Sequence, residues 1–261
     1  MNLLLIGDVI ARAGRQALKR HLPRLRKEHE IAFCIVNAEN AAGGAGITRE
    51  TARDLYDAGA DCLTTGNHVW DKKEVIPYLD EDSRLLRPAN YPAPCPGSGV
   101  HVGTAENGAR VGVINLMGRV YMGGFDDPFR AADRLVADLR GKADVIAVDF
   151  HAELTSEKAA FGWYLDGRVS VVYGTHTHIP TADERILPGG TAFQTDVGMT
   201  GPFDSVIGMQ VEGALQRFLT QRHHRLEPAE GNVQIRATLV EVDASTGKAR
   251  AIRRIVVPDA A

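Results

Sequence analysis

Two histidines, His176 and His178, stand two positions apart, directly after an apolar run at residues 168–173. The run is typical of a buried strand, and side chains on a strand alternate between its two faces. We therefore expect both imidazoles to point the same way, toward one place beyond the carboxyl end of the strand. Imidazole is a common metal ligand, so the pair indicates a metal site if other ligands gather at the same edge.

Further polar side chains follow apolar runs elsewhere in the chain: Asp8, Glu39, Asn40, Asn67, His68 and His151. Each of them alone has an ordinary explanation, as a turn residue, a helix cap or a buried histidine. Together they are harder to dismiss, because ligands of open α/β sheets bind outside the carboxyl ends of the strands, where these positions would converge. The pattern predicts one cluster of metal ligands and acid–base groups.

The types of ligand restrict the metal. Carboxylates, amide oxygens and imidazoles, with no thiolate, favour iron, manganese, zinc or cobalt over magnesium. More candidates are present than one ion takes: Asp8, Glu39, Asn40, Asn67, His151, His176 and His178. A carboxylate such as Glu39 is suited to bridge two ions about 3.5–4 Å apart, the arrangement that serves in-line displacement at phosphorus.

Strands and helices alternate through the first part of the chain, which is typical of an α/β fold. Apolar runs predict strands at residues 2–6, 32–36, 62–65, 110–116, 144–150 and 168–173. Periodicity and caps predict helices at residues 11–29, from the cap Thr48 to Gly59, and at 71–79, 128–140 and 156–165. One further helix near 209–221 and a hairpin of residues 233–242 and 249–257 follow. We expect a single domain over residues 1–261.

The composition is that of a globular protein with a sizeable core, since 44% of the 261 residues are hydrophobic and 24% are charged. A net charge of −3 gives no strong nucleic-acid signal. No apolar run approaches the roughly 20 residues of a membrane helix, and the first residues resemble a strand more than a signal peptide. Cys34, Cys62 and Cys95 form no CxxC motif, and the first two fall in apolar runs, so we expect a reducing, cytoplasmic location.

The order of the motifs resembles that of the calcineurin-like metallophosphoesterases. The matching segments are Gly7-Asp8, Glu39, Gly66-Asn67-His68, His151 and His176-Thr177-His178. Two departures stand out: Ile10 replaces the histidine of the usual D-x-H motif, and Glu39-Asn40 replaces an aspartate. Both departures, with the run Asn37-Ala38-Glu39-Asn40, are similar to one bacterial subgroup, the YmdB-like phosphodiesterases.

The resemblance implies a four-layer α/β/β/α sandwich with a centre of two divalent or mixed-valence metal ions, iron foremost. It implies one ion held by Asp8, Glu39, Asn40 and His178. It implies a second ion held by Glu39, Asn67, His151 and His176. His68 would bind no metal and would protonate the leaving oxygen. The attacking group would be a hydroxide that bridges the two ions, because cations lower the pKa of bound water.

The function that follows is hydrolysis of small nucleotide phosphodiesters, with 2′,3′-cyclic nucleotides implied by the resemblance. A phosphomonoesterase or nucleotidase and an RNase remain alternatives, because the same centre serves all of them. A non-catalytic regulatory protein is a further alternative, which the missing D-x-H histidine favours and the otherwise complete ligand set disfavours. The sequence leaves a homo-oligomer open.

Two loops leave their roles open. Residues 43–46 are rich in glycine and favour a turn before the following helix over a phosphate cradle, since no Gly-Lys-Ser/Thr follows. Residues 121–125 form an apolar, glycine-hinged loop that would stack on a nucleobase, contact another subunit or face the core. The last two readings are slightly favoured. Trp70 is expected to pack, and His223 and His224 are expected to be solvated.

Overall fold

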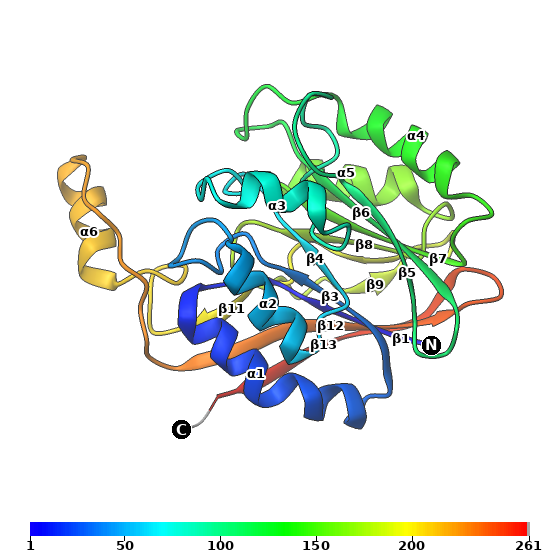
Figure 1. Ribbon diagram of the computed structural model, residues 1–261, viewed down its shortest axis with the longest axis horizontal. Coiled ribbons are helices and arrows are strands. Elements are labelled where there is room, and N and C mark those ends of the chain that lie inside the picture. Colours follow the sequence, from blue (N-terminus) through cyan, green and yellow to red (C-terminus); the bar gives the residue numbers. More distant parts are fainter. Residues whose placement is uncertain (260–261) are drawn as a thin grey trace.

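Two sheets lie face to face in the computed structural model, which describes residues 1–259 (Figure 1). The first has the strand order β2 (Asp8–Val9), β11 (Met199–Pro202), β12 (Val233–Asp243), β1 (Asn2–Ile6), β3 (Ile31–Asn37) and β4 (Cys62–Thr64), and β13 (Lys248–Pro258) pairs with β12. The second has the order β5 (Val100–Thr104), β6 (Arg110–Met117), β7 (Val145–His151), β8 (Val171–Thr175), β10 (Ala192–Gln194) and β9 (Arg185–Ile186).

The core between the sheets follows from the alternation of side chains along the strands. Leu3 and Leu5 of β1 face the second sheet and pack with Val113 of β6 and Val145 of β7. The intervening residue Leu4 belongs to a different core on the opposite face of the first sheet. Both faces of the central strands are therefore buried, which explains why they appear as unbroken apolar runs.

Helices cover the outer face of each sheet. On the first sheet lie α1 (Ala11–Glu28), α2 (Arg49–Ala58) and the short α3 (Val75–Glu81). On the second sheet lie α4 (Pro128–Leu139) and α5 (Thr155–Leu165). The predicted four-layer α/β/β/α sandwich is confirmed (Figure 1).

Two of the helices begin at a residue whose side chain caps them. Thr48 caps α2 through a reciprocal pair of hydrogen bonds with Thr51, and Gly59 ends the helix with a left-handed φ of 115°. Asp127 accepts hydrogen bonds from the first amides of α4, which begins at Pro128. The predicted strands at the amino terminus and the predicted carboxyl-terminal hairpin of β12 and β13 are also confirmed.

Several predicted boundaries are wrong. The helix expected at 71–79 begins only at Val75, because turns occupy residues 71–74 and Asp71 bonds to His68 instead. The strand expected at 168–173 is shifted to Val171–Thr175, since residues 168–170 complete the turn after α5. The strands without a predicted range are β2, β5, β9, β10 and β11, and all of these except β5 have four residues or fewer.

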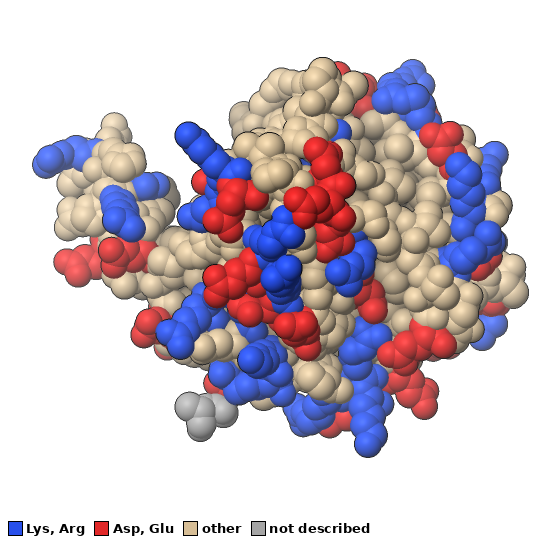
Figure 2. Space-filling model, viewed as in Figure 1, with Lys and Arg blue, Asp and Glu red and all other residues tan. Residues whose placement is uncertain are grey.

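One element stands away from the sandwich. Helix α6 (Val211–Thr220) projects at the left of Figure 1, and Phe218 and Leu219 on it are 77% and 78% exposed. The face drawn in Figure 2 carries acidic and basic residues side by side, with no field of one sign across it. Within residues 1–259, no helix is long and apolar enough to cross a membrane.

Candidate metal centre

The strand ends of both sheets meet at one edge of the sandwich. The first sheet places Asp8 in β2, Glu39 and Asn40 after β3, and Asn67 after β4. The second sheet places His151 at the end of β7, and His176 and His178 after β8. The structure thus brings together all the side chains that the sequence selected as ligands, from strands far apart in the chain.

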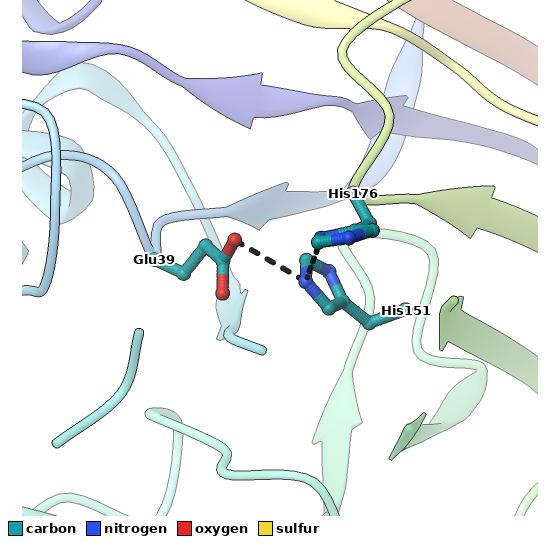
Figure 3. A group of neighbouring side chains, drawn as sticks. All are labelled: Glu39, His151 and His176. Carbon is teal, nitrogen blue, oxygen red and sulfur yellow. Dashed lines mark hydrogen bonds and ion pairs between the residues drawn. The ribbon is translucent and has the colours of Figure 1, made fainter. Parts of the chain in front are cut away.

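One group of ligand atoms comes from Glu39, His151 and His176, which all lie within 4.8 Å of one another (Figure 3). His151 Nε2 lies 3.2 Å from Glu39 Oε1 and 3.1 Å from His176 Nδ1. Asn67 joins this group, with Oδ1 3.0 Å from His151 Nε2. Three kinds of donor therefore converge on one small volume that both sheets enclose.

A second group comes from Asp8, Glu39 and His178, whose ligand atoms also lie within 4.8 Å of one another. Asn40 Nδ2 lies 3.2 Å from Glu39 Oε1 and 3.1 Å from His178 Nε2. Asp8 Oδ1 is 3.9 Å from His178 Nε2 and has no hydrogen-bond partner among the described residues. Glu39 belongs to both groups, as a bridging carboxylate would.

Burial and neighbouring charges shift the pKa values in the first group. Burial alone would raise the pKa of Glu39, but His151 and then His68 overcome it and lower the pKa to about 2. Burial alone would lower the pKa of His151, but the Glu39 and Asp8 carboxylates raise it to about 9. Burial and the nearby His151 lower the pKa of His176 to about 3. The protonated imidazole of His151 thus compensates the negative charge of Glu39.

The pKa of Asp8 is shifted in the opposite direction from that of Glu39. Burial raises its pKa above the ordinary value, although His178 and His151 oppose the rise. A fully buried carboxylate with one unpartnered oxygen is a costly arrangement for a protein to keep. A cation bound at that oxygen would remove the cost, so the residues present fit a metal ion.

A network of hydroxyl, amide and carboxylate groups supports His151 from behind. Thr175 Oγ1 lies 2.9 Å from His151 Nδ1 and donates to Asp149 Oδ1 at 2.7 Å. Asn37 of the other sheet donates to Asp149 Oδ2 at 3.2 Å. Such outer partners fix the orientation of metal-binding imidazoles. No role for these residues was predicted from the sequence, although Asn37 belongs to the run Asn37-Ala38-Glu39-Asn40 and all three are polar residues near the ends of apolar strands.

The expectation that strand alternation points both histidines after β8 to one place is wrong. The strand ends at Thr175, and both His176 (φ 97°) and His178 (φ 66°) are left-handed, so strand alternation does not aim them. His176 lies in the Glu39–His151 group and His178 in the Asp8 group, which is the division that the resemblance implies. Two left-handed residues so close together are strained, and other contacts have to hold them.

A buried ion pair holds this turn. Asp196 Oδ2 accepts from the Thr177 amide at 3.2 Å and from its hydroxyl at 2.8 Å. Lys158 donates to Asp196 Oδ2 at 2.6 Å and to the Thr175 carbonyl at 2.8 Å, and both charged side chains are 1% exposed. On the other side of the turn, His178 Nδ1 donates to the Ile207 carbonyl at 2.8 Å. The sequence analysis did not identify Lys158 or Asp196.

His68 lies beside the cluster on its open side. Its amide donates to Glu39 Oε2 at 3.1 Å, which places the residue next to the shared carboxylate. Its Nδ1 pairs with Asp71 Oδ2 at 2.8 Å, and the side chain is 39% exposed. Because Asp71 occupies one ring nitrogen, Nε2 is the atom that a substrate would meet.

Glu153 is an unpredicted neighbour of the centre. Its Oε2 lies 3.0 Å from His176 Nε2, on the nitrogen that faces away from His151. A carboxylate on the second nitrogen of a metal-binding imidazole fixes the ring and raises its basicity. The only sequence signal for Glu153 is its place two residues after His151.

Comparisons with known proteins agree on one family. A family model described as "YmdB-like protein" matches residues 4–255. A 2′,3′-cyclic-nucleotide 2′-phosphodiesterase of Bacillus subtilis is 47% identical over 259 residues, which cover 99% of this chain and 98% of that protein.

Two solved structures share the fold closely. A hypothetical protein from Thermus thermophilus has a TM-score of 0.93 at 45% identity, covering 99% of both chains. A novel phosphatase from Mycoplasma pneumoniae has a TM-score of 0.92 at 35% identity, covering 99% of this chain and 93% of that chain.

Proposed function

The chain belongs to the YmdB-like protein family, and from this membership we propose that it is a metal-dependent phosphodiesterase of small nucleotides, 2′,3′-cyclic nucleotides among them. The observation that carries the proposal is a pair of ligand groups that share the single carboxylate of Glu39. A shared carboxylate sets two cations close enough to act on one phosphoryl group. Cys34, Cys62 and Cys95 are free thiols, which fits the cytoplasm as its location.

The donors divide between two ions as follows. One ion would be held by Asp8, Glu39, Asn40 and His178, and the other by Glu39, Asn67, His151 and His176. When bound, the ions supply Lewis-acid activation of water and of the phosphoryl oxygens. Imidazole, carboxylate and amide ligands without thiolate suit iron foremost, and also manganese, zinc or cobalt.

His68 completes the chemistry as the proton donor. Water adds to phosphorus, the bond from phosphorus to one ribose oxygen breaks, and that oxygen needs a proton to leave. His68 is placed for this task because Asp71 fixes Nδ1 and the ring is partly open to solvent. An imidazole group serves well as a general acid at physiological pH, where both of its protonation states are accessible.

The departure from the usual D-x-H motif does not leave the ligand set short. Ile10 is fully buried and bonds through its amide to the Thr200 carbonyl, so this position serves the fold. The amide nitrogen of Asn40 lies between Glu39 Oε1 and His178 Nε2, and the side-chain oxygen of the same amide group would supply the additional ligand. This arrangement favours a working enzyme over a regulatory protein with a degenerate site.

Metal analysis followed by a substrate panel tests the proposal. The purified protein should hold about two ions per chain. It should hydrolyse bis-p-nitrophenyl phosphate and 2′,3′-cyclic nucleotides faster than mononucleotides or RNA. A metal-free, inert protein would support the regulatory alternative. A preference for mononucleotides or for RNA would support the nucleotidase or the RNase instead.

The role of His68 has its own test. His68→Ala should keep both metal ions and lose about 10²–10⁴-fold in kcat, the usual contribution of a general acid. His223→Ala, a change to an exposed histidine outside the centre, is the matched control and should keep full activity. Loss of metal from His68→Ala with an intact fold would show that His68 is a ligand instead.

A further inference from the structure

A loop of residues 118–127 connects β6 to α4 (Figure 1). It leaves β6 beside the candidate metal centre, because Met117 pairs with His151. The amide of Gly118, at the start of this loop, donates to the carbonyl of His151 at 3.0 Å. A side chain at Gly118 would come within 2.5 Å of Ala152 Cβ, so the two segments pack as closely as glycine allows. The loop is therefore attached directly to a residue of the centre.

Side chains of the sandwich hold both ends of this loop. Glu157 of α5 accepts a hydrogen bond from the amide of Arg119 at 3.0 Å. The Asn90 side chain donates to the carbonyls of Met117 at 2.8 Å and Asp126 at 3.0 Å, and so joins the start of the loop to its end. A loop anchored in this way presents the residues at its tip in a defined place.

Aromatic rings brace the loop against the segment that carries His68. Trp70 meets Tyr91 edge to face at 5.4 Å between ring centroids, and Tyr91 meets Phe125 in the same way at 4.9 Å. Trp70 lies two residues beyond His68, and Phe125 lies within the loop. The prediction that Trp70 packs is confirmed, because its ring lies against the core and Tyr91. The loop thus borders the centre on the His68 side.

Tyr121, in the first half of this loop, has an exposed aromatic side chain. It is 85% exposed, more than any other large hydrophobic residue in the described part of the chain. Its φ is 64°, a left-handed value that is uncommon for a residue other than glycine and costs free energy. The core-facing reading of this loop, one of two that the sequence slightly favoured, is therefore wrong for Tyr121. A strained backbone that holds a ring in water is typical of a binding site.

We propose that the ring of Tyr121 stacks on the nucleobase of a nucleotide whose phosphate lies at the metal centre. This inference rests on the proposed function. His68 protonates the ribose oxygen that leaves, so the ribose and its base lie on the His68 side, which the braced loop with Tyr121 borders. Stacking tolerates any base, because every base has a π-face. Tyr121 would therefore distinguish nucleosides from other alcohols without selecting one base.

The surface next to His178 is different. Ile179 follows His178 in the chain, and the carbonyl of Ile207 accepts a hydrogen bond from His178 Nδ1. The side chains of Ile179 and Ile207 are 55% and 46% exposed. Branched aliphatic side chains have no π-face for a base. The aromatic position on the His68 side is therefore the one that suits a nucleobase.

Matched substrates test this inference in the metal-loaded enzyme. Tyr121→Ala should raise KM for 2′,3′-cyclic AMP by about 5- to 150-fold, the range that base–aromatic stacking covers, with kcat unchanged. KM for the base-free 1-O-methylribose 2′,3′-cyclic phosphate should stay the same. Tyr121→Phe should restore the wild-type KM, because the ring and not the hydroxyl group stacks. Trp163→Ala removes an exposed ring on α5 and should change neither KM.

The outcomes separate this inference from the proposed function. A wild-type enzyme that hydrolyses neither cyclic substrate would overturn the proposed function and with it the base site. A wild-type enzyme with equal KM for both substrates would overturn the base site alone. The same follows if Tyr121→Ala raises KM equally for both, since the loop would then shape the centre without touching the base.

Discussion

The two ligand groups around Glu39 solve the problem of buried charge differently. In the Glu39–His151–His176 group, an imidazole with a raised pKa lies 3.2 Å from the carboxylate and compensates it. In the Asp8–Glu39–His178 group, Asp8 Oδ1 is fully buried and 3.9 Å from the nearest imidazole nitrogen. One group carries its own counter-charge, and the other lacks one within the described residues.

Because of this difference, the two ions would contribute differently to the free energy of unfolding. At the His151 group, an ion has to displace a proton, so binding there competes with an interaction that the chain already makes. At the Asp8 group, an ion supplies a charge that the chain does not provide. We therefore expect metal at the Asp8 group to add more to the free energy of unfolding.

Loss of the shared carboxylate should have the largest effect, because it removes the feature that the groups have in common. Glu39→Gln should lower the affinity for both ions by more than about 100-fold, since even outer-shell changes cost 10- to 100-fold. Activity should disappear with the metal. Metal content after dialysis and turnover of bis-p-nitrophenyl phosphate measure the two effects. Retention of one tightly held ion would show that the groups are independent.

Single changes on either side of Glu39 should act in opposite directions on the metal-free protein. His151→Ala leaves the Glu39 carboxylate buried without its partner and should cost about 3–5 kcal/mol in the free energy of unfolding. Asp8→Asn removes a buried charge whose oxygen has no partner and should be neutral or stabilising.

Urea unfolding of the chelated proteins at pH 7 measures both values. His223→Ala, which changes an exposed histidine, is the control and should unfold like the wild type. If Asp8→Asn destabilises the chelated protein as much as His151→Ala does, the comparison between the two groups is wrong.

The pH dependence of the metal-free protein should show a smaller effect that belongs to His151. A raised pKa stabilises the fold fully below the unfolded value near 6.5, and this contribution is lost as the pH rises through about 9. Burial raises the pKa of Asp149 from 3.8 to about 6, so its contribution is lost as the pH rises between these two values, below this window. The free energy of unfolding should therefore fall by about 3 kcal/mol between pH 6.5 and 9. His151→Ala should abolish that slope, and a slope that persists would assign it to another group.

Much of the fold was predictable because its central strands are buried on both faces. Runs such as Ile31–Asn37 are apolar almost throughout, and helices such as Arg49–Ala58 have local caps that mark both ends. The unpredicted strands are short or lie at an edge of a sheet, and distant partners determine them: Met199–Pro202 pairs with Asp8–Val9 and with Val233–Asp243. No local pattern encodes such pairing.

In the candidate site too, residues with a local sequence signal were predictable, and residues placed by distant contacts were not. Asp8, Glu39 and His151 were identifiable because polar residues at the ends of apolar strands need a reason to be there. Lys158 was not, because a lysine on a helix is ordinarily exposed, and only the fold places it beside Asp196. The left-handed turns at His176 and His178 were also unpredictable, since Asp196, which holds them through Thr177, lies 19 residues further along the chain.

The strand order of the first sheet sets when during synthesis the centre can exist. Strand β2 carries Asp8 and pairs with β11, and β11 connects to β1 and β3 only through β12, which spans Val233–Asp243. A growing chain therefore lacks the complete sheet that aligns Asp8 with Glu39 until β12 has left the ribosome. A chain cut before β12 would lack the strand that joins β11 to β1, and with it the sheet order that places Asp8 beside Glu39.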